Sequence, residues 1–125
     1  MKVGYVRVST VEQNLARQLE LMKTLGVEKI YCDKMSGKNT ERTEFKEMIE
    51  FLREGDTLYV ESFSRLSRST LDFLNTVSRL QAKSVNLVSD KEKMDMSTPQ
   101  GKFMVTVFAA LSELERTSML ERQRE

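Results

Sequence analysis

The sequence predicts an α/β domain with a mostly parallel central sheet of four to five strands flanked by helices. Two observations support this prediction. Short apolar runs with strand periodicity alternate four times with longer segments whose apolar residues recur at helical spacing. The chain has 125 residues, 39% of them hydrophobic, which is enough for one domain with a sizeable core. Repeated strand–helix–strand units of this size form parallel sheets with helices packed on their faces.

The first half of the chain contains two predicted strands, each followed by a helix. Residues 2–8 form the first strand, and the helix after it is expected to end at Gly26, because glycine commonly terminates helices. Residues 29–33 form the second strand, and polar residues 34–43 predict a loop after it. The second helix is expected to end at Gly55. Helical spacing is shown by Leu15, Leu19, Met22 and Leu25 in the first helix and by Phe45, Met48, Ile49 and Leu52 in the second.

The second half repeats this alternation and ends in a long helix. Residues 57–62 and 85–89 predict two more strands, with a helix between them. Thr98 is a good N-cap for the last helix, Pro99 suits its first position, and no stop signal follows. A helix of about 26 residues is about 39 Å long, more than this domain needs, so its end is expected to project. The helix between the two strands is marked by Leu71, Leu74, Val77 and Leu80.

Composition narrows the function classes. The net charge is +1, which argues against a free-standing electrostatic nucleic-acid binder but allows a local basic patch. The absence of histidine excludes a Ser–His nucleophile pair. No phosphate-binding glycine loop and no Cys/His cluster is present, so no nucleotide cofactor and no metal are expected. No apolar stretch is long enough to span a membrane and no signal peptide begins the chain, so we expect a cytoplasmic protein.

The end of the first strand carries the first candidate site residues. Alternation along the strand points Tyr5, Arg7 and Ser9 to one face, and in open α/β sheets the chemistry lies where strands end and helices begin. Ser9 is either a nucleophile or the N-cap of the following helix. Arginine beside serine suits phosphate chemistry, because a guanidinium matches phosphate oxygens and neutralises the charge that develops on them. Tyr5 either belongs to the core or supports this site.

A second cluster follows the third strand. Arg65 and Arg68 are three residues apart, about one helical turn, and the parallel sheet places them at the same edge as the end of the first strand. The alternative is a solvated helix entry with Ser69 as the cap and Asp72 completing a capping box. Arginines on two strand ends favour a functional cluster. Three further candidates have open alternatives: Gln18 faces the sheet edge or solvent, and Ser36 and Arg42 contact substrate or fill a loop.

A set of short motifs runs in order along the chain: Tyr5-Val6-Arg7-Val8-Ser9, Gln13, Gln18, Ser36-Gly37, Arg42, Arg65-Leu66-Ser67-Arg68, Pro99-Gln100-Gly101-Lys102 and Leu114-Glu115-Arg116. Together they resemble the catalytic domain of the serine recombinases, the resolvase/invertase family, over essentially all 125 residues. The resemblance implies site-specific DNA recombination through a covalent 5′-phosphoserine intermediate, with Ser9 as the nucleophile. It also implies that Arg7, Arg65 and Arg68 surround the scissile phosphate, supported by Tyr5, Gln18, Ser36 and Arg42.

The resemblance also implies an assembly on DNA. Residues 1–98 would be the α/β core and residues 99–125 a dimerisation helix whose charged end passes over double-stranded DNA at a recombination site. The protein would act as a homodimer and as a tetramer in the synaptic complex, with a separate C-terminal DNA-binding domain that is absent from this chain. Phosphate contacts from the helix would come from Arg116, Arg122 and Arg124.

One departure from the family pattern concerns proton transfer. The family commonly has an aspartate where this chain has Ser64, and glycine is frequent where it has Ser67. A carboxylate general acid or base at position 64 is therefore excluded. Two other function classes stay open: a flavodoxin-like module that binds a phosphorylated ligand without cutting DNA, with Ser9 only a cap, and a non-catalytic dimerisation domain. The motifs do not specify resolution, inversion, integration or transposition, nor the target site.

Overall fold

The protein is described by a computed structural model over residues 1–9, 15–35 and 41–124, with side chains in the last helix through Glu115 and at Thr117 and Ser118. A five-stranded sheet has the order β2-β1-β3-β4-β5, in which the first four strands are parallel and β5 is antiparallel to β4. The predicted fold class is therefore confirmed. The strands are β1 (Lys2–Ser9), β2 (Lys29–Met35), β3 (Thr57–Val60), β4 (Asn86–Ser89) and β5 (Met94–Asp95).

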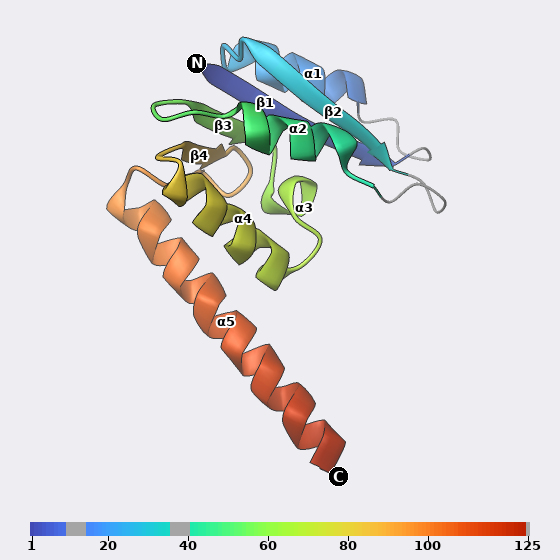
Figure 1. Ribbon diagram of the computed structural model, residues 1–125, viewed down its shortest axis with the longest axis vertical. Coiled ribbons are helices and arrows are strands. Elements are labelled where there is room, and N and C mark those ends of the chain that lie inside the picture. Colours follow the sequence, from blue (N-terminus) through green and yellow to red (C-terminus); the bar gives the residue numbers. More distant parts are fainter. Residues whose placement is uncertain (10–14, 36–40, 125) are drawn as a thin grey trace.

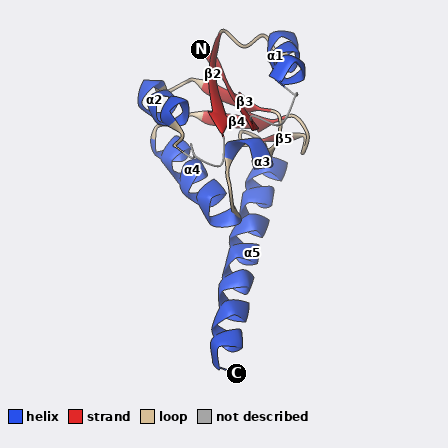
Figure 2. Ribbon diagram, turned by 90° about the vertical axis from the view of Figure 1, so that its right-hand side faces the viewer, coloured by secondary structure: helices blue, strands red, loops and turns tan. Residues whose placement is uncertain are grey.

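The helices cover both faces of the sheet. Figure 2 shows α1 on one side of the sheet and α2 and α4 on the other, while most of α5 extends away from the body of the domain (Figure 1). Among the described residues, no helix is long and apolar enough to cross a membrane. The helices are α1 (Leu15–Thr24), α2 (Thr43–Phe51), α3 (Phe63–Leu66), α4 (Thr70–Ala82) and α5 (Pro99–Arg124).

Alternation along β1 divides the interior into two clusters. Val6 and Val8 pack with Met22 of α1 on one face. On the other face, Tyr5 belongs to the larger core with residues of α2 and α4, and its ring meets that of Phe45 edge-on at 5.5 Å between centroids. The next residues on the Tyr5 face are Arg7 and Ser9, because side chains alternate along a strand. The core thus fixes the strand that carries Arg7 and Ser9 near its C-terminal end.

The sequence located one helix end and missed another. Gly26 follows α1 with φ of +76°, as expected of a glycine that terminates a helix. The expectation that α2 ends at Gly55 is wrong, because the helix ends at Phe51 and Leu52 turns to extended backbone. There Leu52 is buried, and the Lys83 ammonium donates to its carbonyl oxygen at 3.2 Å. Gly55, with φ of +90°, lies instead in the turn before β3.

The base of α5 is held tightly against the domain. The backbone N–H of Gly101 donates to the Thr98 hydroxyl at 3.1 Å, so the expected N-cap is present. Farther along, Phe108 packs against the rings of Phe63 and Phe73, with centroids 5.1 and 5.2 Å apart. These contacts fix the direction in which the helix leaves the body of the domain.

Gly101→Ala is expected to destabilise the domain by about 2 kcal/mol or more, the cost of overpacking a tight site. A Cβ at Gly101 would lie 2.0 Å from the Asp95 carbonyl oxygen, so α5 and β5 would have to separate. Urea unfolding of this variant beside Thr106→Ala, an exposed position on the same helix, measures the effect. Equal unfolding midpoints for the two variants would show that the contact is not required.

Candidate active site

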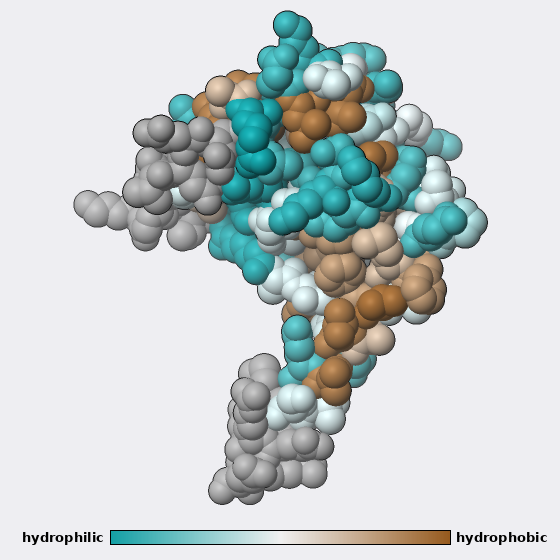
Figure 3. All heavy atoms as spheres, turned by 180° about the vertical axis from the view of Figure 1, so that it is seen from behind, coloured by the Kyte–Doolittle hydropathy of each residue, from teal (hydrophilic) through white to brown (hydrophobic). Residues whose placement is uncertain are grey.

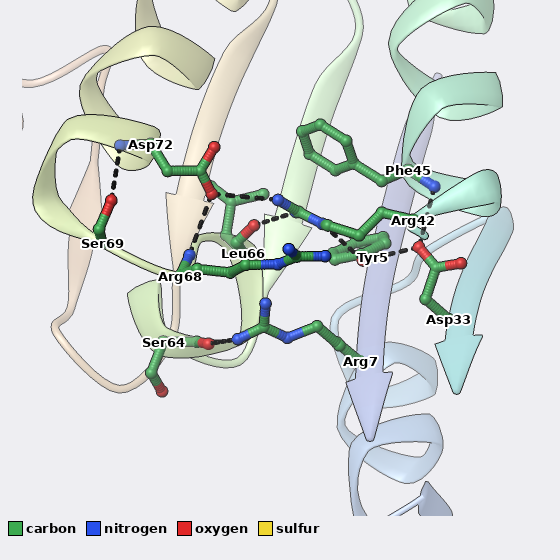
Figure 4. A network of polar contacts seen from close by, with 10 residues as sticks. All are labelled: Tyr5, Arg7, Asp33, Arg42, Phe45, Ser64, Leu66, Arg68, Ser69 and Asp72. Atoms are coloured by element: carbon green, nitrogen blue, oxygen red, sulfur yellow. Dashed lines mark hydrogen bonds and ion pairs between the residues drawn. The ribbon is translucent and has the colours of Figure 1, made fainter. Parts of the chain in front are cut away.

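The carboxyl ends of β1, β2 and β3 meet at one edge of the sheet, where the candidate residues gather. The parallel register places Arg7 opposite Asp33 on β2, and α3 and α4 follow β3 at this edge. Figure 4 shows the guanidinium groups of Arg7, Arg42 and Arg68 near one another, although they come from β1, the segment before α2 and the segment before α4. The sequence-based placement of Arg7 and Arg68 at one edge is thus seen in the structure.

Arg7 joins β1 to α3 through both its side chain and its backbone carbonyl. Its guanidinium donates to the backbone carbonyl of Ser64. Its own carbonyl accepts from the Gln18 amide at 3.3 Å and from the Arg65 guanidinium at 3.4 Å. Gln18 is fully buried, so of its two alternatives the one that faces the sheet edge is correct. Arg7, Gln18 and Arg65 are therefore brought together, as the sequence suggested.

A buried carboxylate, which sequence reasoning missed, organises the neighbouring strand end. Asp33 accepts a hydrogen bond from the Tyr5 hydroxyl at 2.8 Å and from the backbone N–H groups of Glu44 and Phe45, both at 3.0 Å. It thereby caps the N-terminus of α2, where a negative charge is favourable. The available signal was an aspartate at the C-terminal end of the predicted strand 29–33, in the segment that leads to the second helix. Tyr5 is fully buried, so it belongs to the core and also reaches this edge.

Arg42 is buried, with only 7% of its surface exposed, and its guanidinium interacts with other groups of the domain. Its guanidinium donates to the Tyr5 hydroxyl at 3.4 Å, to the Asp72 carboxylate at 3.1 Å and to the Leu66 carbonyl. It also lies 3.7 Å from the centre of the Phe45 ring. The described contacts make Arg42 a link between β1, α3 and α4. A direct contact with substrate stays a prediction.

The segment before α4 combines a helix cap with an exposed arginine. The Ser69 hydroxyl accepts from the backbone N–H of Asp72 at 3.1 Å, as the capping alternative expected. The Asp72 carboxylate in turn accepts from the backbone N–H of Arg68 at 3.0 Å. The Arg68 side chain is exposed and extends between Arg42 and Arg7 in Figure 4. The cap and the arginine cluster are therefore both present.

Positive charge is concentrated around Arg7. Burial lowers the pKa of the Arg7 guanidinium, and the charges of Arg42, Arg68 and Arg65 lower it further. An arginine so perturbed is still protonated at neutral pH. An anion bound among these groups would relieve their mutual repulsion. The pKa of the Tyr5 hydroxyl is raised, chiefly by burial, so it remains a neutral hydrogen-bond donor.

Ser9 is the last residue of β1 and is half-buried. Ser64 is exposed, and its hydroxyl lies 2.9 Å from that of Ser62. Within the described part of the chain, no group of three or more His, Cys, Asp or Glu residues could hold a metal ion. Ser36 falls outside the described residues, and so do the side chains of three further candidates on α5, namely Arg116, Arg122 and Arg124.

Comparison with known proteins shows the family of this chain. The family model for the resolvase N-terminal domain matches residues 2–125. The chain belongs to the resolvase family. A resolvase from Clostridium perfringens is 42% identical to this domain over 130 residues, which cover 100% of the chain and 69% of that protein. A DNA-invertase from Enterobacteria phage P7 is 44% identical over 124 residues, covering 99% of the chain and 67% of that protein.

Solved structures support the same assignment. The crystal structure of a resolvase family site-specific recombinase from Streptococcus pneumoniae superimposes with a TM-score of 0.81 at 29% identity, covering 99% of this chain and 93% of that one. The resolvase-family chain is thus the catalytic domain of a site-specific recombinase, which is an enzyme. Of the function classes that the sequence left open, the recombinase is the one that these comparisons support. The chain spans about two thirds of the length of the two curated relatives.

Proposed function

We propose that this recombinase domain cuts DNA with Ser9 and stays joined to the 5′-phosphate of the cut strand. The Ser9 Oγ forms a bond to phosphorus while the bond from phosphorus to the 3′-oxygen breaks. The hydroxyl proton leaves Ser9, and the departing 3′-oxygen takes up a proton. Attack of another strand's 3′-hydroxyl on the phosphoserine reverses these steps and rejoins DNA. Because one phosphodiester bond is exchanged for another ester, no ATP is needed.

The observation that carries this proposal is the position of Ser9 beside Arg7, Arg65 and Arg68, which are called the arginine cluster below. Ser9 lies two residues beyond Arg7, on the same face of β1 and at the sheet edge that also holds Arg65 and Arg68. Guanidinium forks bind phosphate oxygens and stabilise the charge that develops in phosphoryl transfer. Arg7, Arg65 and Arg68 are therefore proposed to bind the scissile phosphate. The described contacts of Tyr5, Gln18 and Arg42 fit a supporting role, and that of Ser36 stays a prediction.

Proton transfer in this domain is proposed to use hydroxyl groups and arginines. Ser64 stands where a carboxylate is common in the family, and its hydroxyl lies within hydrogen-bond distance of the buried Ser62 hydroxyl. The Arg7 guanidinium donates to the Ser64 carbonyl next to this pair. In this proposal, the hydroxyl groups and the guanidinium pass the proton along their hydrogen bonds, and no carboxylate at position 64 is needed.

The direct test is covalent capture of DNA by the complete protein that contains this chain. The DNA is the protein's own recombination site, with a nick placed so that the cleaved end diffuses away. We expect this DNA to form a protease-sensitive adduct with the protein. The released 3′-hydroxyl should be extendable by a polymerase, while the 5′-end should be blocked. The same DNA with a scrambled crossover sequence is the control. A protein that binds the site and forms no adduct, or one joined to a 3′-end, would refute the proposed chemistry.

The proposed partners are double-stranded DNA and further copies of the chain. Apolar side chains are exposed along one side of α5, and Figure 3 shows hydrophobic surface running from the body of the domain onto this helix. A second copy of the same helix, related by two-fold symmetry, is the proposed cover, and two such dimers would bring four Ser9 hydroxyls to four strands. The separate C-terminal DNA-binding domain and the contacts of Arg116, Arg122 and Arg124 stay predictions. The exposed apolar residues are Phe103, Val107, Leu111 and Leu114.

Leu111→Glu is expected to weaken dimerisation at least about tenfold, because an interface leucine replaced by a charge costs about 1.4 kcal/mol or more. Sedimentation equilibrium measures this change. Leu71→Glu is the matched control, since Leu71 is similarly exposed on α4, and it should dimerise like the wild type. A Leu111→Glu variant that dimerises normally would exclude α5 as the contact. Phe108, on the same helix, is unsuitable for this test because its ring packs against Phe63 and Phe73 of its own domain.

A further inference from the structure

Arg68 lies in the short connection between α3 and α4, outside the hydrogen bonds of either helix. The residues on either side of it have extended backbones, with φ and ψ of −137° and 152° at Ser67 and −151° and 168° at Ser69. Its backbone N–H donates instead to the Asp72 carboxylate at 3.0 Å. The Asp72 side chain therefore helps to hold the Arg68 backbone in place.

The Asp72 side chain is held by the buried part of the site. The same carboxylate oxygen that accepts from the Arg68 backbone also accepts from the Arg42 guanidinium at 3.1 Å. Arg42 in turn contacts the Tyr5 hydroxyl, which is bonded to Asp33 at the end of β2. Hydrogen bonds thus connect Tyr5 of β1 and Asp33 of β2 to the backbone of Arg68 through the Asp72 carboxylate (Figure 4).

We propose that Asp72 is a positioning residue for cleavage, which sets the place of Arg68 relative to Arg7 by tying the start of α4 to the Tyr5–Arg42 pair. The inference rests on the proposed function, in which Arg68 binds the scissile phosphate. Asp72 itself touches no reacting atom. Its effect is geometric, because a displacement of about 1 Å in a catalytic group can slow a reaction about 100-fold.

The competing role for Asp72 is purely structural. An acidic residue in the first turn of a helix stabilises it, and α4 also has the Ser69 cap. A structural role and a positioning role differ in one measurable respect. If Asp72 acts through Arg68, its replacement should slow cleavage only when the Arg68 side chain is able to bind the scissile phosphate. A change that merely weakens α4 should slow cleavage by the same factor with or without a functional Arg68.

The test is a double-mutant cycle in the complete protein, measured as the rate of adduct formation on the nicked site at saturating protein. Asp72→Ala alone is expected to slow cleavage about 100-fold, with binding to the site nearly unchanged. In the Arg68→Lys background, the same replacement should slow cleavage by less than about threefold, because residues that act as a unit are not additive. Ser69→Ala, which removes the helix cap, is the matched control and should have the same small effect in both backgrounds.

Asp72→Asn, with a similar shape, provides the measurement if Asp72→Ala is poorly folded. It removes the charge that faces Arg42 and should show the same non-additivity with Arg68→Lys. Equal losses in the two backgrounds, or a wild-type rate for the folded Asp72 variants, would overturn the positioning role while leaving the proposed function intact. A wild-type rate for Arg68→Lys alone would instead remove Arg68 from the phosphate site, and this inference with it.

Discussion

Ser9→Ala is expected to abolish the covalent adduct while the domain stays folded. The hydroxyl is the proposed nucleophile at the end of β1, and alanine cannot replace it. If Ser9 were only a helix cap, its loss would cost about 0.5–2 kcal/mol of stability and leave cleavage in place. Adduct yield on the nicked site and the urea unfolding midpoint, measured on the same preparation, separate the two roles.

Ser78→Ala is the matched control for this experiment, because Ser78 is exposed on α4, away from the arginine cluster. It should form adduct at the wild-type yield. A Ser9→Ala protein that also gave the wild-type yield would end the assignment of Ser9 as nucleophile. A lowered unfolding midpoint with normal cleavage would establish the capping role instead.

Replacement of Arg7, Arg65 or Arg68 by lysine should slow cleavage about 100- to 1,000-fold, the loss that follows removal of one preorganised donor to a developing negative charge. Lysine keeps the charge but loses the planar fork that matches phosphate oxygens. Binding to the recombination site should stay nearly intact, because the charge is conserved. Single-turnover cleavage rates and site affinities, measured in parallel, test both parts.

Arg53→Lys is the control for general effects of this replacement, since Arg53 is exposed in the turn that precedes β3, at the opposite edge of the sheet. It should cleave at the wild-type rate. Normal rates for all three cluster variants would mean that the arginines do not bind the scissile phosphate. A loss of site affinity that matched the loss of rate would mean that they bind DNA without favouring the transition state.

Most of the fold follows from local sequence patterns, and the missed parts have physical causes. The strand and helix periodicities predicted the parallel strands and the helices that flank them, because each of these elements buries one face. The four-residue α3 and the two-residue β5 are too short to show a period. The end of α2 was misplaced because the burial of Leu52 and the Lys83 contact, rather than Gly55, terminate the helix.

The site was predictable where a residue's role follows from its strand and was missed where it depends on tertiary contacts. Arg7, Arg65 and Arg68 were placed at one edge by parallel topology alone. The sequence could not show that Arg42 turns inward, because its partners come from β1, α3 and α4. It also could not show Asp33 joining Tyr5 to the start of α2, a bond between residues 28 positions apart.

The measurement that tests the central claim most directly is identification of the amino acid joined to DNA. The adduct from the nicked site is digested with protease, and the peptide that carries the nucleotide is sequenced by mass spectrometry. We expect a phosphodiester linkage between the Ser9 Oγ and a 5′-phosphate, in the peptide that contains Ser9. A linkage through Ser62, Ser64 or any residue other than Ser9, or to a 3′-phosphate, would contradict it.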